Sequence, residues 1–208
     1  MKSFGCSLLA ATVAIAAAAA LAAAQEEQEQ VMTSQSFLNT FCDGSPITME
    51  VEMLEGSSGT WAGDCKLVLA NRLEVQTGKS TTTRVAGNLT ISSVSGAFSG
   101  GKFQLEEMST LSATSINAAV DKMQVKKGSQ LEATAGGLKV MAIREVQVEE
   151  GAVVSATGGA VTLKAGREVQ LKKMSTVTSD VAVTAAAPKC QAEQPSTVTA
   201  PEVNVCMM

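Results

Sequence analysis

VQVEEGAVV, residues 146–154, is one of four copies of a nine-residue frame that recurs along the chain. The others are FQLEEMSTL from Phe103, MQVKKGSQL from Met123 and VQLKKMSTV from Val169, at offsets of 20, 23 and 23 residues. Each copy holds an apolar residue, a glutamine, a second apolar residue, two like charges, a methionine or glycine, and an aliphatic residue in the ninth place. Repetition at a nearly fixed period is typical of a stacked repeat protein.

A second, weaker pattern precedes three of these frames. Residues 116–120, 138–143 and 161–165 carry apolar side chains largely at alternate places, as strands with one buried face do. Short segments rich in Ala, Thr and Gly separate the two patterns and are typical of turns. Each repeat therefore reads as strand, sharp corner, strand and turn, and at about 3.3 Å per residue it makes one circuit of a small coil. We expect an all-β, single-domain parallel β-solenoid (β-helix) with 20–23 residues per coil and disulfide-tied ends.

A glutamine occupies the same place in every frame. Alternate side chains of a strand face opposite ways, so the apolar neighbours of each glutamine point into the coil and the glutamine points out. Parallel strands of successive coils lie about 4.8 Å apart, which stacks the glutamines into a ladder whose amides can hydrogen-bond along it. The predicted ladder consists of Gln104, Gln124, Gln147 and Gln170.

The charged pair changes sign from one frame to the next. Stacking places glutamate pairs over lysine pairs, and opposite charges at that spacing attract by about 0.2 to 1 kcal/mol per exposed pair. A slip by one whole repeat would place glutamate over glutamate, so the alternation favours a single register. Ordinary solvated surface charge is the alternative interpretation. The residues of this charge ladder are Glu106, Glu107, Lys126, Lys127, Glu149, Glu150, Lys172 and Lys173.

Residues 1–24 have the layout of a secretory signal peptide: an early lysine, an apolar run and a small-residue end. A retained membrane anchor is the alternative, although the run is short and alanine-rich and no second long apolar stretch follows. Cleavage after Ala24 leaves 184 of the 208 residues and moves the formal charge from −4 to −5 through the loss of Lys2. We expect a secreted protein, extracellular or on the cell surface, without a membrane span after cleavage.

Four cysteines remain after cleavage, an even number that predicts two disulfides in an oxidising compartment. Three connectivities are open, and the pairs Cys42 with Cys65 and Cys190 with Cys206 would tie the two ends of an elongated fold. An intermolecular bridge through Cys206 is one alternative. A metal site is another, disfavoured because the chain has no histidine and no CxxC. We expect no metal and no cofactor.

Composition divides the rest of the chain. The polar segment 25–36 is expected to be a disordered linker. Residues 37–81 are expected to form an N-terminal cap and irregular first coils, and the repeats fill 82–187. Three prolines break the pattern in 188–208, which we expect to wrap the last coil as a tail or cap.

The totals exclude several function classes. The acidic charge and the 3% aromatic content argue against nucleic-acid binding, which uses basic surfaces and stacking aromatics. Without histidine there is no conventional Ser-His or Cys-His pair for nucleophilic catalysis. A polysaccharide-cleaving β-helix would need clustered acids in a long cleft, yet the aspartates are scattered and the coils have no long loop to wall one. We expect no enzyme and no catalytic residues.

Two smaller features concern the surface. Asn88 begins NLT, an N-glycosylation sequon if the host is a eukaryote. Thr114, Thr134 and Thr157 recur at equivalent turn positions, with Ser179 nearby, and a threonine ladder on a flat solenoid face suits ice binding. A broad flat two-column Thr-x-Thr array is missing, however, and a threonine beside a glycine turn is ordinary turn chemistry.

The repeat pattern over 89–183 resembles secreted β-solenoid adhesins of the filamentous-haemagglutinin type in period and composition. The chain is far smaller, shows no matching secretion-domain motif, and offers no functional residue to carry over. We expect a non-enzymatic structural or adhesive module of the cell surface or extracellular matrix, with self-association or a matrix or glycan partner. A β-solenoid that binds ice or polysaccharide is the alternative, followed by a carbohydrate-active β-helix enzyme.

Overall fold

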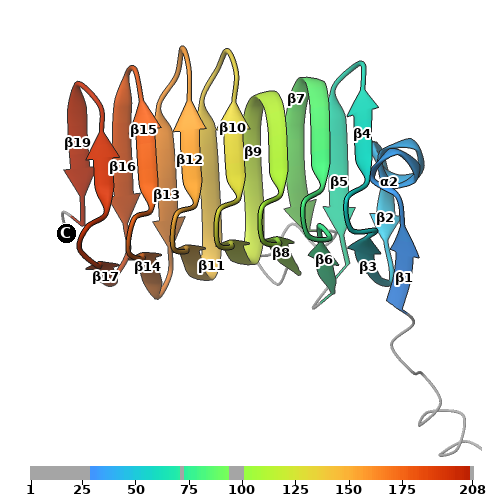
Figure 1. Cartoon of the computed structure of the whole chain (residues 1–208), viewed down its shortest axis with the longest axis horizontal. Helices are drawn as coiled ribbons and strands as arrows, with labels where there is room; N and C mark the ends of the chain where they lie inside the picture. Colours follow the sequence, from blue (N-terminus) through green and yellow to red (C-terminus); the bar gives the residue numbers. More distant parts are fainter. Residues whose placement is uncertain (1–28, 71–72, 94–100, 207–208) are drawn as a thin grey trace, which may run out of the picture.

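Short strands rich in β-branched residues stack in parallel along one axis (Figure 1). The computed structural model describes residues 29–70, 73–93 and 101–206, and these form a parallel β-solenoid of about seven turns. In the later coils each strand pairs with the strand three places further along the chain, so one coil contributes three strands. The β-solenoid expected from the sequence is confirmed, with three strands per coil because the nine-residue frame bends at its charged pair and spans two of them.

The strands form three faces. Face A contains β1 (Glu29–Met32), β3 (Glu50–Met53), β6 (Glu74–Gln76), β8 (Lys102–Leu105), the end of β9 (Thr110–Val125), the end of β11 (Leu138–Val148), β14 (Glu168–Leu171) and β17 (Lys189–Ala192). Face B contains β4 (Ser58–Trp61), the start of β7 (Thr82–Ser93), the start of β9, β10 (Gln130–Ala133), β12 (Val153–Ala156), β15 (Thr176–Ser179) and β18 (Thr197–Thr199). Face C contains β2 (Asp43–Ile47), β5 (Cys65–Leu69), the remainder of β7, the middle of β9, the start of β11, β13 (Val161–Ala165), β16 (Ala182–Ala186) and β19 (Glu202–Val205).

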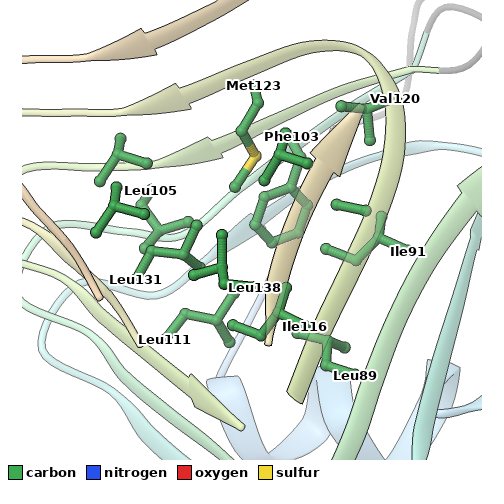
Figure 2. Packing of buried hydrophobic residues seen from close by; sticks show 14 of the residues in the cluster. Leu89, Ile91, Phe103, Leu105, Leu111, Ile116, Val120, Met123, Leu131 and Leu138 are labelled. Atoms are coloured by element: carbon green, nitrogen blue, oxygen red, sulfur yellow. The ribbon is translucent and has the colours of Figure 1, made fainter. Parts of the chain in front are cut away.

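The interior of the coil is filled by aliphatic side chains from all three faces. Figure 2 shows Phe103 and Met123 of face A, Leu131 of face B and Ile116 of face C meeting there, and each of these side chains is buried. Fully burying such a side chain contributes about 1.5 to 3 kcal/mol. The core therefore forms by stacking, since every coil buries its inward residues only against its neighbours.

A sharp corner joins face A to face B in each coil. Its third residue has a positive φ in six successive coils, a conformation that suits glycine and costs other residues about 1 to 2 kcal/mol. The backbone amide of this residue donates to a carbonyl of the next coil, as from Met108 to Lys127 and from Gly128 to Glu150, both at 3.1 Å. The six residues are Gly56, Ser80, Met108, Gly128, Gly151 and Met174.

The helix α2 (Ser34–Phe41) covers the N-terminal end of the stack (Figure 1). Thr33 caps it by accepting a hydrogen bond from the Ser36 amide at 3.2 Å. The side-chain amide of Gln35 accepts from the backbone N–H of Thr60 at 2.9 Å and donates to its carbonyl at 3.2 Å. These two bonds occupy the outer edge of β4, which would otherwise be open for pairing with another chain.

Both disulfides predicted at the ends are present. Cys42, directly after α2, is bonded to Cys65, the first residue of β5, and this bond ties the helix to the first complete coil. Cys190 of β17 is bonded to Cys206, directly after β19, and closes the last coil. Each bond therefore fixes one end of the described solenoid.

Two segments at the ends differ from the sequence-based expectation. The segment predicted as a disordered linker contains β1, which pairs with β3, and the start of α2. Its polar composition hid the N-cap at Thr33 and the buried side chains of the helix that follows. Residues 25–28 and the expected signal peptide lie outside the described residues.

The expected C-terminal tail, 188–208, instead adds a further coil of strands up to Val205. Pro188, Pro195 and Pro201 lie between its strands, where proline removes no donor from a strand ladder. The prolines therefore mark the corners of the last coil, not the end of the repeat.

We expect Met108→Gly and Met174→Gly to stabilise the protein by up to about 1 kcal/mol each. Glycine removes the cost of a positive φ, and the greater backbone entropy that it gives the unfolded chain offsets only part of this gain. Equilibrium denaturation would measure the change. Gly56→Ala is the matched reverse variant, since no atom lies within 4 Å of an added Cβ there and only the backbone preference changes. Equal or lower stability of both glycine variants would contradict this assignment of strain.

Candidate functional site

The glutamine ladder on face A is longer than predicted. Register pairs Gln76 with Gln104 and Gln170 with Gln191, which extends the four predicted glutamines by one at each end. The Gln124 amide donates to the Gln147 side-chain oxygen, and the Gln147 amide donates to that of Gln170 at 3.1 Å. These polar groups bond to one another along the stack and hold successive coils together.

A column of charges beside the glutamines was missed by sequence reasoning. The side-chain nitrogens of Lys102 and Lys122 lie 2.9 Å from carboxylate oxygens of Glu74 and Glu145 respectively, each across one step between coils. The third pair, Lys189 with Glu168, is 2.7 Å long, and its hydrogen bond, with that from Gln170, lowers the pKa of Glu168. The signal was the charged residue directly before each frame.

The predicted charge ladder lies at the corner between faces A and B. Lys126 contacts Glu106 at 2.5 Å and Lys172 contacts Glu149 at 3.9 Å, so the first charge of each pair meets an opposite charge in a neighbouring coil. The Glu106 side chain is only 13% exposed and that of Lys126 29%. The first charges form an inner column, which is less exposed to water than the column formed by the second charges. Its contacts are therefore the stronger ones.

The second charge of each pair forms an outer column. Lys127 lies 3.8 Å from Glu150, and Glu107 lies 3.4 Å from Lys79, a residue outside the predicted set. Glu55 occupies the same corner place one coil earlier, so the alternation of sign runs through Glu55, Lys79, Glu107, Lys127, Glu150 and Lys173. These side chains are about half exposed or more where they pair, which makes each contact worth little on its own.

A shallow hollow lies at the corner between faces C and A, lined by Lys122, Arg144, Glu145, Arg167 and Glu168. Arg144 donates from Nε to the Asp121 carboxylate at 2.7 Å, and this bond raises the pKa of Arg144. Both signs of charge line the hollow, so it presents no concentrated field to a charged ligand.

Face B carries two outward columns that sequence reasoning did not assemble. The first and third residues of each of its strands point outward, and five members of each column are serine or threonine. We call these the hydroxyl columns. One contains Ser58, Thr82, Thr110, Gln130, Val153, Thr176 and Thr197; the other contains Thr60, Arg84, Ser112, Glu132, Ser155, Thr178 and Thr199.

The turn threonines singled out in the sequence lie beside these columns. Thr114 and Thr134 donate their hydroxyls to the carbonyls of Ala86 and Ala113, at 2.6 and 3.2 Å, as turn residues do. Ser179 is buried and donates to the carbonyl of Gly159 at 2.8 Å. The expectation that a Thr-x-Thr array is missing was wrong in part, since the pattern stands on face B in two neighbouring strands, β15 (Thr176–Ser179) and β18 (Thr197–Thr199).

Asn88, the sequon residue, is exposed at the start of a face C strand, and both atoms of its side-chain amide are engaged. Its nitrogen donates to Asp64 at 3.1 Å, and its oxygen accepts from the Ser115 hydroxyl at 2.6 Å. Glycosylation at Asn88 stays a prediction.

Within 29–70, 73–93 and 101–206, no group of three or more His, Cys, Asp or Glu side chains is arranged to hold a metal ion. None of the helices described there has the length and apolar character needed to cross a membrane. The two disulfides are compatible with an extracellular protein.

Comparison of the chain with protein-family models, with curated proteins and with solved structures gives no match.

Glu52 lies in line with the glutamine column, one coil before its first member, Gln76. Burial raises its pKa, and so do the hydrogen bond and charge of Glu29 and the charges of Glu106 and Glu55. The folded state therefore takes up this proton more readily than the unfolded chain does, and the ionised side chain opposes folding at neutral pH.

We expect Glu52→Gln to raise the melting temperature at pH 7, because it removes a disfavoured charge and continues the glutamine ladder. The gain in melting temperature is absent below pH 4.5, the ordinary pKa of glutamate, because the side chain is then protonated in both states. It grows as the pH rises through the raised pKa of Glu52. Thermal melts across this range would measure it. Glu132→Gln on face B is the control and should show no such trend. A gain of equal size at every pH would contradict the electrostatic explanation.

Replacing Lys126 and Lys127 together by glutamate places an acidic pair between two others, and we expect it to lower the free energy of unfolding by about 1 to 2 kcal/mol. Chemical denaturation would measure the loss. Reversing the charged pairs of all four frames restores opposite signs between the frames and should recover most of the stability, less the loss of the Lys79–Glu107 contact. A double reversal that leaves stability unchanged would show that these charges are merely solvated.

Proposed function

We propose that the chain is an exported, non-enzymatic structural or adhesive module that presents a flat, repetitive face to an extended extracellular surface. The observation that supports this proposal is the shared register of about seven turns, which sets the same outward positions at constant spacing along each face. A row of equivalent groups suits a partner that is itself periodic and extended. A small soluble ligand would instead need a concave site.

The distribution of charge supports the non-enzymatic part of the proposal. Carboxylates such as Glu74, Glu106 and Glu145 each contact a lysine of a neighbouring coil. Such pairs hold the stack together, and in the shallow hollow that Glu145 lines the carboxylates stand among lysine and arginine side chains, an arrangement that does not favour acid–base chemistry.

Self-association is a second route to the same role. β17, β18 and β19 form the C-terminal end in Figure 1, and each pairs with one strand of the preceding coil. Their outer edges offer unpaired backbone groups among the described residues. Stacking of a second copy onto this end would lengthen the same faces.

The test is retention of the purified protein on insoluble extracellular materials, namely ice, microcrystalline cellulose, chitin and mineral powder, with soluble oligosaccharides as competitors. We expect one insoluble material to retain the protein and its soluble fragments to compete poorly, because many weak contacts act together only on an extended surface. Light scattering run in parallel would detect oligomers. Absence of retention on every material, in a protein that also stays monomeric, would overturn the proposal.

A further inference from the structure

The hydroxyl columns differ from the polar groups of face A in their bonding. On face A the glutamines bond to each other and the charges pair between coils. The serine and threonine hydroxyls of the two columns make no hydrogen bond to the described part of the chain. Except at Ser112, which is buried, these hydroxyls are left to bond with whatever lies on the face.

The columns are regular and nearly free of charge. The pairing of β10, β12, β15 and β18 runs without a register shift, so the columns stay straight over these coils. Arg84 and Glu132 are the charged members, both in the N-terminal and central coils. From β12 to the end the outward residues are uncharged and mostly β-branched: Val153, Ser155, Thr176, Thr178, Thr197 and Thr199.

The spacing of these hydroxyls matches a tetrahedral water network. Neighbours in one column lie about 4.8 Å apart, too far for a direct hydrogen bond. Two hydrogen bonds of about 2.75 Å that meet at a tetrahedral angle span about 4.5 Å, so one water fits between successive hydroxyls with little strain. The methyl groups beside the hydroxyls offer that water no competing partner. A straight run of hydroxyls such as Ser155, Thr178 and Thr199 therefore has the spacing that waters bridge with the tetrahedral geometry of ice.

We propose that face B binds ice through the hydroxyl columns. This inference rests on the proposed function and names its extended partner. An uncharged surface of small side chains fits an uncharged lattice, because a charge would hold its own hydration shell against the ice. A crystalline polysaccharide fits less well, since no aromatic ring stands in the columns for stacking on sugar. Trp61 of β4 falls outside both, and its Nε1 donates to the Asp64 carbonyl at 2.9 Å.

The experiment measures incorporation of fluorescently labelled protein into a slowly grown ice crystal, together with the shape and growth of single crystals. We expect the wild-type protein to enter the ice and to shape the crystals. Thr178→Tyr raises a ring above the centre of face B, so it should lose incorporation. Thr184→Tyr makes the same change on face C in the same coil and should keep it. Equal melting temperatures of the two variants exclude unfolding as the cause.

Two results would overturn the inference. If the wild-type protein is excluded from ice, face B does not bind it. Retention on cellulose, chitin or mineral would then leave the proposed function standing with another partner, and retention on no material by a protein that also stays monomeric would remove both. If the two tyrosine variants lose incorporation equally, while both stay folded, the binding surface is not face B.

Discussion

The backbone pairing between coils at the corner of faces A and B is the constraint on which the rest of the structure depends. There the chain turns through a residue of positive φ, and the amide of that residue is bonded to the next coil, as at Gly128 and Gly151. A slip of one residue in any coil would turn its apolar side chains outward and break this bond. One register therefore decides which residues share a column, and the columns decide the chemistry of each face.

Much of the fold could be predicted from the sequence, because the repeats are easy to recognise wherever a frame carries its charged pair. The frames from Phe103 to Val177 predicted the period, the inward residues, the glutamine ladder and the sign alternation. The frame was invisible where its markers change: Leu54 and Gly78 replace the first charge of the corner. Coils at the N-terminal end were therefore assigned to a linker and a cap. The last coil was assigned to a tail because of Pro188, Pro195 and Pro201, although it follows the same path.

The hydroxyl columns could not be found in the same way. A threonine in a strand is unremarkable, and only the register shows that Thr176 lies beside Val153 and Thr197 and not beside a charge. The turn threonines, which are adjacent to glycines, drew attention to the neighbouring positions instead. The columns form only when the chain folds, since neighbours within one column are separated by 20 residues or more along the sequence.

The faces divide two tasks between them. Face A and its corner use paired charges and linked amides to hold the coils in register, and most of their polar groups are satisfied within the chain. Face B contributes its inward residues to the core but leaves its outward hydroxyls unbonded. The helix at one end and the disulfides at both ends keep the stack from fraying. Face B can therefore stay flat although its outward hydroxyls form no bonds that would stabilise it.

A high-resolution crystal structure of the mature protein tests this account most directly, because it would show the register and the water on each face together. We predict that the hydroxyls of face B lie in two straight columns, with single ordered waters bridging Ser155, Thr178 and Thr199 in one column and Thr176 and Thr197 in the other. A coil shifted in register, or water on face B no better ordered than on face C, would contradict it.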